Sequence, residues 1–260
     1  MRKVSYLLSV VLYIAFILFL GLYPKVRVIP FKFDPSSIFH SVAFFLLILF
    51  LIDQTKNKFV AFVFSVFLGV FIEVLQKFIP GRISSRYDFI FDIVGIILGM
   101  VLNTKGRNFV FKVIASFGGI GYIPYAPGTI ASLLFTVLLY WWGTLRKIFI
   151  WQIFLIILPV AIYVAQKVED LKGDDPRMCV IDEIVGMCIP LLMVPHHLAF
   201  YGISFLSFRI FDIWKPFGIS KMENRVKGGL GIVLDDLVAG IYAAIFVLVI
   251  RLFLNLRVSF

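Results

Sequence analysis

Long apolar runs constrain the fold of this chain more than any other feature of its sequence. A helix needs about 20 mostly apolar residues to cross the hydrocarbon core of a membrane, and the first run, Val4–Leu22, approaches that length. Further apolar runs are Ile38–Ile52, Phe59–Ile79, Phe89–Leu102, Thr129–Trp142, Ile148–Val168, Ile181–Pro195, Leu198–Asp212 and Ile232–Leu254. We therefore predict an all-α fold, a polytopic membrane helical bundle of about nine membrane helices in two modules.

The composition agrees with a lipid environment and excludes an ordinary water-soluble domain. Hydrophobic residues make up 61% of the 260 positions and charged residues 15%, whereas soluble domains have about 45–50% and 25%. The net charge is +10, but the basic residues stand singly between apolar runs instead of forming one basic face. Such flanking charges attract anionic lipid. We expect the membrane and an anionic phospholipid as partners, and no nucleic acid.

A polar segment divides the chain into two parts. Residues 103–108 read Asn-Thr-Lys-Gly-Arg-Asn, and they separate four apolar runs from the five that follow. We predict a four-helix membrane domain over residues 1–103, a polar joint over 104–108 and a second membrane domain over 109–260. The oligomeric state is not indicated by any pattern in the sequence.

The distribution of Lys and Arg predicts the orientation of the second part. If Arg2 and Lys3 are cytoplasmic and nine helices alternate, most basic residues near the helix ends of the second part also lie in the cytoplasm. The same topology places four polar segments, rich in glycine, proline or acidic residues, on that face. These four segments are therefore expected to form one site.

The first of these segments is Gly118–Thr129, which ends where an apolar run begins. Backbone N–H groups at a helix N-terminus suit a phosphate oxygen, and glycines allow it to approach closely. Gly128 and Thr129 are thus candidates for binding phosphate. The alternative is that Thr129 is only the N-cap of the helix.

The second segment contains Asp174, Asp175 and Pro176, followed by Asp182 and Glu183 at the start of another apolar run. An ionised residue at membrane depth costs roughly 2.5–3.5 kcal/mol, so a retained Asp-Glu pair indicates a function or a partner. A hard cation such as Mg²⁺ prefers carboxylate oxygens. Alternatively, the two acids only favour the positive end of the helix dipole.

The third segment carries Arg209, Asp212 and Lys215, each three residues from the next. On a helix this spacing places all three side chains along roughly one stripe. Asp212 could bind a metal ion while Arg209 and Lys215 bind phosphate oxygens. The three residues could equally form an ion-paired cluster.

The fourth segment combines Gly228, Gly229 and Gly231 with Asp235 and Asp236. The glycines leave the backbone free to fold around an anion. The two carboxylates are further metal-ligand candidates. Because adjacent residues on a helix do not face the same way, one of the two alone could bind the metal directly.

Together the segments hold the groups needed for metal-assisted phosphoryl transfer. The candidates for catalysis and for Mg²⁺ binding are Asp182, Glu183, Asp212, Asp235 and Asp236. A divalent ion polarises the phosphoryl group and activates water, while Arg and Lys offset the charge on the oxygens. A transporter or scaffold with buried charges is the alternative from another class, but no inverted repeat is visible.

These motifs resemble the phosphatidylglycerophosphatase A family over about Phe109 to Leu254. The matching pieces are Gly121–Pro124, Ala126–Thr129, Asp175–Pro176, Ile181–Glu183, Phe208–Pro216 and Gly228–Gly240. The resemblance implies a Mg²⁺-dependent membrane enzyme that converts phosphatidylglycerophosphate to phosphatidylglycerol and phosphate in bacterial phospholipid synthesis. We therefore expect it in the bacterial inner membrane, and the distribution of Lys and Arg predicts an active site on the cytoplasmic face. Ala131, Gly218 and Val233 depart from the usual family pattern. Another lipid phosphate remains open as the substrate, because no motif specifies the headgroup.

The first part of the chain has its own polar residues within apolar runs. The candidates for a second site are Glu73, Gln76, Arg82 and Asp88. Together with His40 upstream and the Gly95-x-x-x-Gly99 pattern, they resemble the VanZ-like family of membrane domains over about residues 1–103, although Asp92 replaces the usual Asn. This resemblance implies little about mechanism. Glu73, Arg82 and Asp88 could also form a structural ion-pair network, and the two glycines predict close helix packing.

Overall fold

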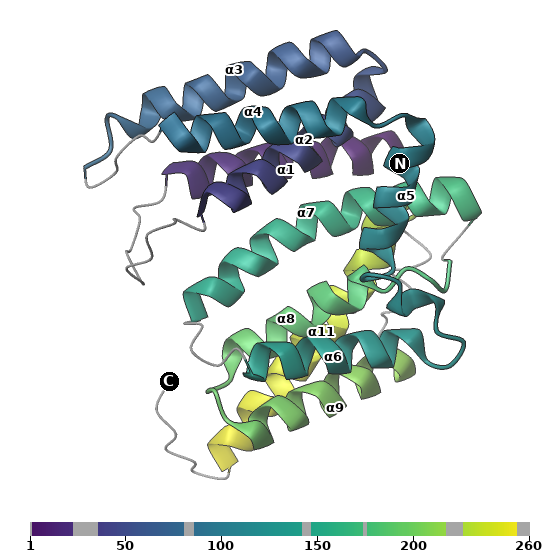
Figure 1. The fold of residues 1–260 in the computed structure, drawn as a ribbon. Coiled ribbons are helices and arrows are strands. Elements are labelled where there is room, and N and C mark those ends of the chain that lie inside the picture. The colour runs from purple at the N-terminus through teal and green to yellow at the C-terminus, as the bar shows by residue number, and fades with distance from the viewer. Residues whose placement is uncertain are drawn as a thin grey trace. The chain divides into compact units, whose positions relative to one another are not determined.

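A computed structural model of the chain describes residues 2–22, 36–80, 86–141, 147–173, 176–216 and 226–253. These residues form α-helices and one short 3-10 helix, with no strand among them (Figure 1). The elements are α1 (Arg2–Leu22), α2 (Ser36–Thr55), α3 (Lys58–Gln76), α4 (Arg86–Val101), α5 (Thr104–Ala115), η1 (Ile120–Tyr122), α6 (Pro127–Trp141), α7 (Lys147–Lys172), α8 (Ile181–Met193), α9 (Leu198–Trp214) and α11 (Gly229–Phe253). The predicted all-α class is confirmed.

Five of the described helices are long and apolar enough to cross a membrane, namely α1, α2, α3, α7 and α11, and α4 with α5 would add a sixth if this bent pair counts as one span. The chain is thus a membrane protein, but the predicted count of nine membrane helices is not confirmed. The difference arises from α6, α8 and α9, which have 15, 13 and 17 residues. At about 1.5 Å per residue, none of the three reaches the roughly 30 Å of a hydrocarbon core.

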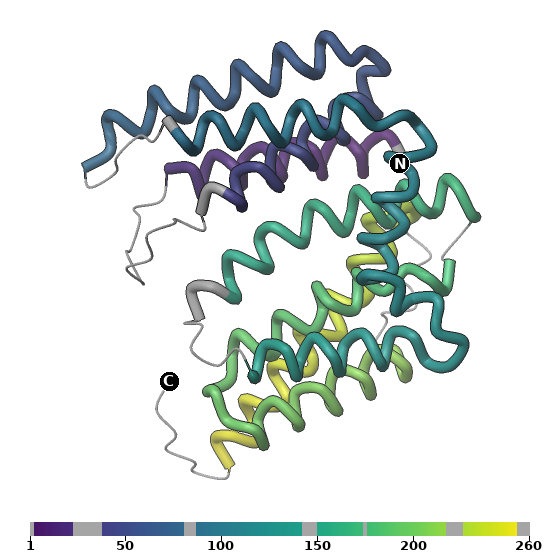
Figure 2. Tube along the Cα trace, viewed as in Figure 1, coloured from purple at the N-terminus to yellow at the C-terminus, as the bar shows by residue number. Residues whose placement is uncertain are grey.

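The internal contacts divide the chain into two compact units. The C-terminal unit comprises Met1–Ser9 and Val110–Phe260, and the N-terminal unit comprises Val10–Phe109. The first turns of α1 therefore pack with the C-terminal unit, although the rest of that helix belongs to the N-terminal unit. The tube drawing in Figure 2 follows the chain through these helices.

Close helix packing defines the N-terminal unit. A Cβ atom added at Gly95 would collide with the backbone of Ser41, and one added at Gly99 would collide with Ile48, so α4 lies directly against α2. This confirms the packing role predicted for the Gly-x-x-x-Gly pattern.

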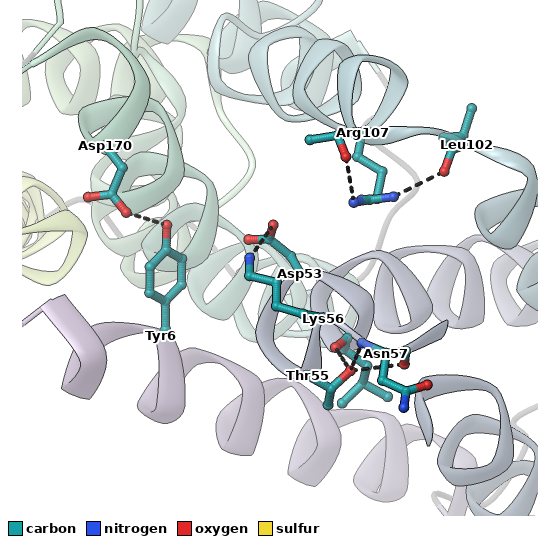
Figure 3. A network of polar contacts seen from close by, with 10 residues as sticks. Tyr6, Asp53, Thr55, Lys56, Asn57, Leu102, Arg107 and Asp170 are labelled. Atoms are coloured by element: carbon teal, nitrogen blue, oxygen red, sulfur yellow. Dashed lines mark hydrogen bonds and ion pairs between the residues drawn. The ribbon is translucent and has the colours of Figure 1, made fainter. Parts of the chain in front are cut away.

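Residues 104–108, which the sequence suggests as a polar joint, form the first turns of α5. The Asn103 side chain caps this helix by accepting from the Gly106 N–H at 2.8 Å. Arg107 donates back to the Leu102 carbonyl oxygen at 3.0 Å (Figure 3). These bonds stabilise the first turn of α5.

In the C-terminal unit, α8 is the central helix, since it packs against α6, α7, α9 and α11. Ten of its 13 residues are buried. Its closest neighbour is α11, because Gly186 on α8 leaves room for the carbonyl oxygen of Asp236, and Gly240 on α11 leaves room for that of Gly186. This close crossing brings the acidic residues at the start of α8 beside those of α11.

Candidate active site

The four polar segments of the C-terminal unit meet at one end of its helices, as the sequence predicts. Gly121 lies against the backbone of Met178, and Gly128 at the start of α6 lies against the side chain of Glu183. Lys215 at the end of α9 reaches Asp235 near the start of α11. The cytoplasmic position of this end stays a prediction.

Three carboxylates form the core of the site. Asp182 and Glu183 occupy the first turn of α8, and Asp236 lies in the second turn of α11. One oxygen from each lies within 4.8 Å of the others. Asp182 and Asp236 are buried, and Glu183 Oε2 is a buried oxygen without a hydrogen-bond partner among the described residues. We call these three residues the carboxylate cluster; a divalent cation would offset the repulsion between their charges.

Asp212 and Arg209 of α9 adjoin the carboxylate cluster. Arg209 Nη1 lies 2.6 Å from Asp212 Oδ2, so these two residues form the ion pair that their spacing predicts. Electrostatic interactions connect Asp212 with Asp236, and Arg209 with Glu183. Arg209 Nε is buried and has no hydrogen-bond partner within the described part of the chain. It remains available to donate to a bound anion.

Lys215 does not continue the stripe of Arg209 and Asp212, and that prediction is wrong. The α9 helix ends at Trp214, and Lys215 follows it in the left-handed conformation, with a φ of 44°. Its side chain therefore leaves the helical stripe, and Nζ lies 2.9 Å from Asp235 Oδ2. Asp235 thus faces Lys215 while its neighbour Asp236 joins the carboxylate cluster, as expected for adjacent residues on a helix.

Gly128, at the start of α6, leaves room for the side chain of Glu183. The helix begins at Pro127, a favoured first position because proline lacks the N–H that would be unsatisfied there. Gly128 is buried, and a side chain in its place would collide with the Glu183 carboxylate. Thr129 lies inside the first turn, so the alternative of Thr129 as the N-cap is wrong. Phosphate binding by Gly128 and Thr129 stays a prediction.

Gly228 and Gly229, at the start of α11, pack on α7. A Cβ atom at Gly228 or Gly229 would collide with Gln166. The buried Gly229 N–H donates to Gln166 Oε1 at 3.0 Å. Gly231 is buried in the first turn of α11. Helix packing thus accounts for the small size of Gly228 and Gly229, and phosphate binding by all three glycines stays a prediction.

A polar network around Gln166 was not predicted. Gln166 Nε2 donates to Glu169 at 3.2 Å and to Asp170 at 3.1 Å. Asp170 also accepts a hydrogen bond of 2.7 Å from the Tyr6 hydroxyl (Figure 3). Gln166 and Tyr6 lie inside apolar runs, and Tyr6 is 164 positions from Asp170. Neither helical periodicity nor a short sequence spacing could therefore predict that these side chains meet. The only available signal was the presence of polar groups within those runs.

The two histidines of the C-terminal unit, His196 and His197, lie away from the site. His196 Nε2 is 3.0 Å from the carbonyl oxygen of Tyr140 at the C-terminal end of α6. The carboxylate cluster adjoins the opposite end of the same helix, at Gly128. Asp174 and Asp175 lie outside the described residues.

The described contacts of Gln76 and Asp88, two of the candidates in the N-terminal unit, lead to different residues. Gln76 is fully buried, and its amide donates to the Gly21 carbonyl oxygen at 2.9 Å, whereas Glu73 is half-buried. Asp88 instead lies near His40, with 3.9 Å between Oδ2 and Nε2. His40 Nδ1 is also 3.0 Å from Asp92 Oδ1. Arg82, the fourth candidate, lies outside the described residues, so the predicted ion-pair network with it stays a prediction.

Comparisons with known proteins match the part of the chain that contains this site. The family model of Phosphatidylglycerophosphatase A matches residues 113–251. Two relatives are named "Phosphatidylglycerophosphatase A". The one from Escherichia coli is 33% identical over 48% of this chain and 74% of the relative. The one from Haemophilus influenzae is 38% identical over 51% of this chain and 83% of the relative. A "Putative phosphatidylinositol-3-phosphatase" of Bacteroides thetaiotaomicron is 39% identical over 56% of this chain and 97% of the relative. No solved structure matches the chain significantly.

All three relatives are named as phosphatases of lipid phosphates, which confirms the prediction of a phosphatase and disfavours the transporter or scaffold alternative. The family match covers more than half of the chain and includes every residue of the carboxylate cluster. The chain therefore belongs to the phosphatidylglycerophosphatase A family.

Proposed function

We propose that the C-terminal unit hydrolyses phosphatidylglycerophosphate to phosphatidylglycerol and inorganic phosphate. The observation that carries this proposal is the carboxylate cluster, in which Asp182, Glu183 and Asp236 approach within 4.8 Å inside the family-matched region. Two relatives with 33% and 38% identity bear the name of this activity. The apolar helices suit a substrate that is itself a membrane lipid.

Mg²⁺ is the proposed cofactor, and the residues of the cluster fit it. All three offer the oxygen ligands that a hard cation prefers, and the buried Glu183 Oε2 is left without a hydrogen-bond partner among the described residues. Asp212, through its interaction with Asp236, is a fourth candidate ligand. When bound, the ion would polarise the phosphoryl group and favour ionisation of the attacking water. Asp235, paired with Lys215, would support the site from outside the metal shell.

The cations would bind the phosphate that is removed. Arg209 presents a buried Nε donor without a partner among the described residues, beside Glu183. Its planar guanidinium suits phosphate oxygens. Lys215 is partly exposed next to Asp235, so it can turn toward the same phosphate. Both positive charges would stabilise the charge that develops on the oxygens during transfer.

Phosphatidylinositol 3-phosphate is the second candidate substrate. It is favoured by one observation, the 39% identity with the relative from Bacteroides thetaiotaomicron, 97% of which is covered by this chain. Both candidate lipids carry a phosphomonoester on a polyol headgroup, so the same carboxylate cluster could serve either.

We further propose that the active site faces the cytoplasm at a bacterial inner membrane, where basic flanks and anionic lipid would be in contact. For residues 1–103 we propose a VanZ-like membrane domain, supported by the contact of His40 with Asp92 and by the close approach of Gly95 to Ser41. Neither feature assigns that unit a reaction.

A panel of lipid phosphates tests the proposed function. Purified protein in detergent is given phosphatidylglycerophosphate, phosphatidylinositol 3-phosphate or phosphatidic acid, each with Mg²⁺ or with EDTA, and released phosphate is measured. We expect the highest kcat/KM with phosphatidylglycerophosphate and no release in EDTA. A higher kcat/KM with phosphatidylinositol 3-phosphate would favour the second candidate, and no release from any lipid would refute both.

A further inference from the structure

A cleft next to the carboxylate cluster gathers two cations and an aromatic ring. It has a volume of about 510 Å³, within the range of roughly 300–1,000 Å³ that is typical of ligand sites. Its lining residues are Gly121, Tyr122, Ile123, Pro124, Pro127, Lys172, Pro176, Arg177 and Met178. Lys172 Nζ lies 5.1 Å from the centre of the Tyr122 ring, and both Lys172 and Arg177 are exposed. Among these described lining residues the charged ones are both cations, so the cleft is complementary to an anion.

The walls of the cleft continue into the carboxylate cluster. Pro127 lines the cleft, and the next residue, Gly128, lies against the Glu183 side chain. Met178 also lines the cleft, its backbone meets Gly121, and the chain enters α8 at Ile181. Residues that line the cleft are thus followed within a few positions by residues of the carboxylate cluster, so one ligand can contact both.

Both candidate lipids have a pair of charged groups. Each carries the phosphomonoester that is removed and, across a polyol spacer, the phosphodiester that joins the headgroup to diacylglycerol. Phosphatidic acid has the phosphomonoester but no phosphodiester. Lys172 offers a compact positive charge and Arg177 offers a fork of donors, and both groups bind phosphate oxygens.

We propose that Lys172 and Arg177 bind the phosphodiester of the substrate in this cleft while the carboxylate cluster acts on the phosphomonoester. The inference rests on the proposed function, since it concerns how the same site selects its lipid. It makes the two cations determinants of specificity, which favour lipids with both phosphates over phosphatidic acid.

The test compares substrates that have and lack the phosphodiester. Full-length protein in mixed micelles with Mg²⁺ is assayed on phosphatidylglycerophosphate and on phosphatidic acid. In the double variant Lys172→Gln/Arg177→Gln, the loss of two charge-assisted contacts should raise KM for phosphatidylglycerophosphate about 10- to 100-fold. The kcat for that lipid, and kcat/KM for phosphatidic acid, should stay within about twofold, because neither cation is proposed to contact the phosphomonoester.

Three single variants distinguish charge in the cleft from charge elsewhere. Lys227→Gln removes an exposed positive charge that lies shortly before α11 and does not line the cleft. The KM of this variant for phosphatidylglycerophosphate should equal that of the wild type. Lys172→Gln alone should raise that KM. Arg177→Lys keeps the charge and should largely preserve a low KM.

Several results would overturn the inference. Equal losses on both lipids would mean that the cations attract any anionic substrate, and an unchanged KM in the double variant would mean that the cleft does not bind the lipid. Wild-type protein that turns over phosphatidylinositol 3-phosphate but not phosphatidylglycerophosphate would refute the proposed function alone, and the same variants would then be compared on that lipid. Protein that turns over neither lipid would refute both.

Discussion

The two units both bury carboxylates, but they surround them with different partners. In the C-terminal unit, Asp182, Glu183 and Asp236 come from two helices and face one another within 4.8 Å. In the N-terminal unit, Asp88 and Asp92 of one helix share His40. Asp88 and Asp92 share a histidine that can carry a positive charge, whereas three carboxylates that face one another favour an additional, bound cation. Among the described residues, the C-terminal acids are the group that brings three ligand oxygens within 4.8 Å of one another, and it is there that we propose a metal site.

The largest expected effect comes from removing one charge of the carboxylate cluster. Asp236→Asn keeps the size of the side chain but removes the charge that a hard cation requires, so turnover should fall by roughly a thousandfold or more. The measurement is phosphate release from phosphatidylglycerophosphate at several Mg²⁺ concentrations.

The matched control is Asp88→Asn, which removes an equally buried charge in the N-terminal unit. Its turnover should stay within about twofold of the wild type, although its thermal stability should fall because a buried contact with His40 is lost. If Asp88→Asn abolished turnover, or if Asp236→Asn retained it, the contrast between the units would be wrong.

Lys215→Ala should have a smaller effect on catalysis. Its loss leaves the metal ligands in place but removes a charge near the proposed phosphate, so kcat should fall about 10- to 100-fold while the Mg²⁺ dependence is retained. The Mg²⁺ concentration that gives half-maximal turnover separates the two roles. A large rise in that concentration would instead assign Lys215 to the support of the metal site.

A test of geometry compares two glycines of the C-terminal unit. A Cβ atom at Gly186 would lie 2.5 Å from the carbonyl oxygen of Asp236 and 2.7 Å from the Phe208 ring, whereas one at Gly202 meets nothing within 4 Å. Gly186→Ala should therefore destabilise the unit by about 1–3 kcal/mol and reduce activity. Gly202→Ala should be neutral or slightly stabilising, by up to about 1 kcal/mol. The measurement is the thermal unfolding of both variants. Equal melting temperatures for Gly186→Ala and Gly202→Ala would refute the close crossing of α8 and α11.

The smallest expected effect concerns the start of α1. Tyr6→Phe removes the hydroxyl that donates to Asp170 at 2.7 Å, which should cost about 1 kcal/mol of stability, with turnover nearly unchanged. A fall in melting temperature of about 2–4 °C would show the loss. No fall, measured beside the wild type in the same detergent, would mean that this bond does not hold residues 2–9 to the C-terminal unit.

Much of the helical fold could be predicted because hydropathy alone specifies a helix in lipid. The first apolar run, Val4–Leu22, corresponds to α1 at Arg2–Leu22, and the last, Ile232–Leu254, corresponds to α11 at Gly229–Phe253. The helical state of residues 104–108 was not predicted, since that segment is polar and its helix depends on the Asn103 cap and on Arg107. The predicted number of spans was not confirmed, because a short apolar helix and a membrane span have the same composition.

The convergence of the site could also be predicted, since each acidic or glycine-rich segment stands at the end of an apolar run. The individual partners could not. Lys215 was expected beside Asp212 by helical spacing, but the helix ends one residue earlier and the lysine turns to Asp235. The bond from Gly229 to Gln166 joins residues 63 positions apart and depends on how α7 packs against α11, which no local pattern contains.

Metal binding measured together with turnover tests the central claim most directly. Mn²⁺ can replace Mg²⁺ as a spectroscopic probe of oxygen ligands, so its binding to metal-free protein is followed by electron paramagnetic resonance in the wild type, Asp182→Asn and Asp236→Asn, with phosphate release measured on the same samples. We expect the wild type to bind the ion and release phosphate, and both variants to lose binding and turnover together while they remain folded. If both variants bound the ion and released phosphate as well as the wild type does, the assignment of the carboxylate cluster as the metal site would be contradicted.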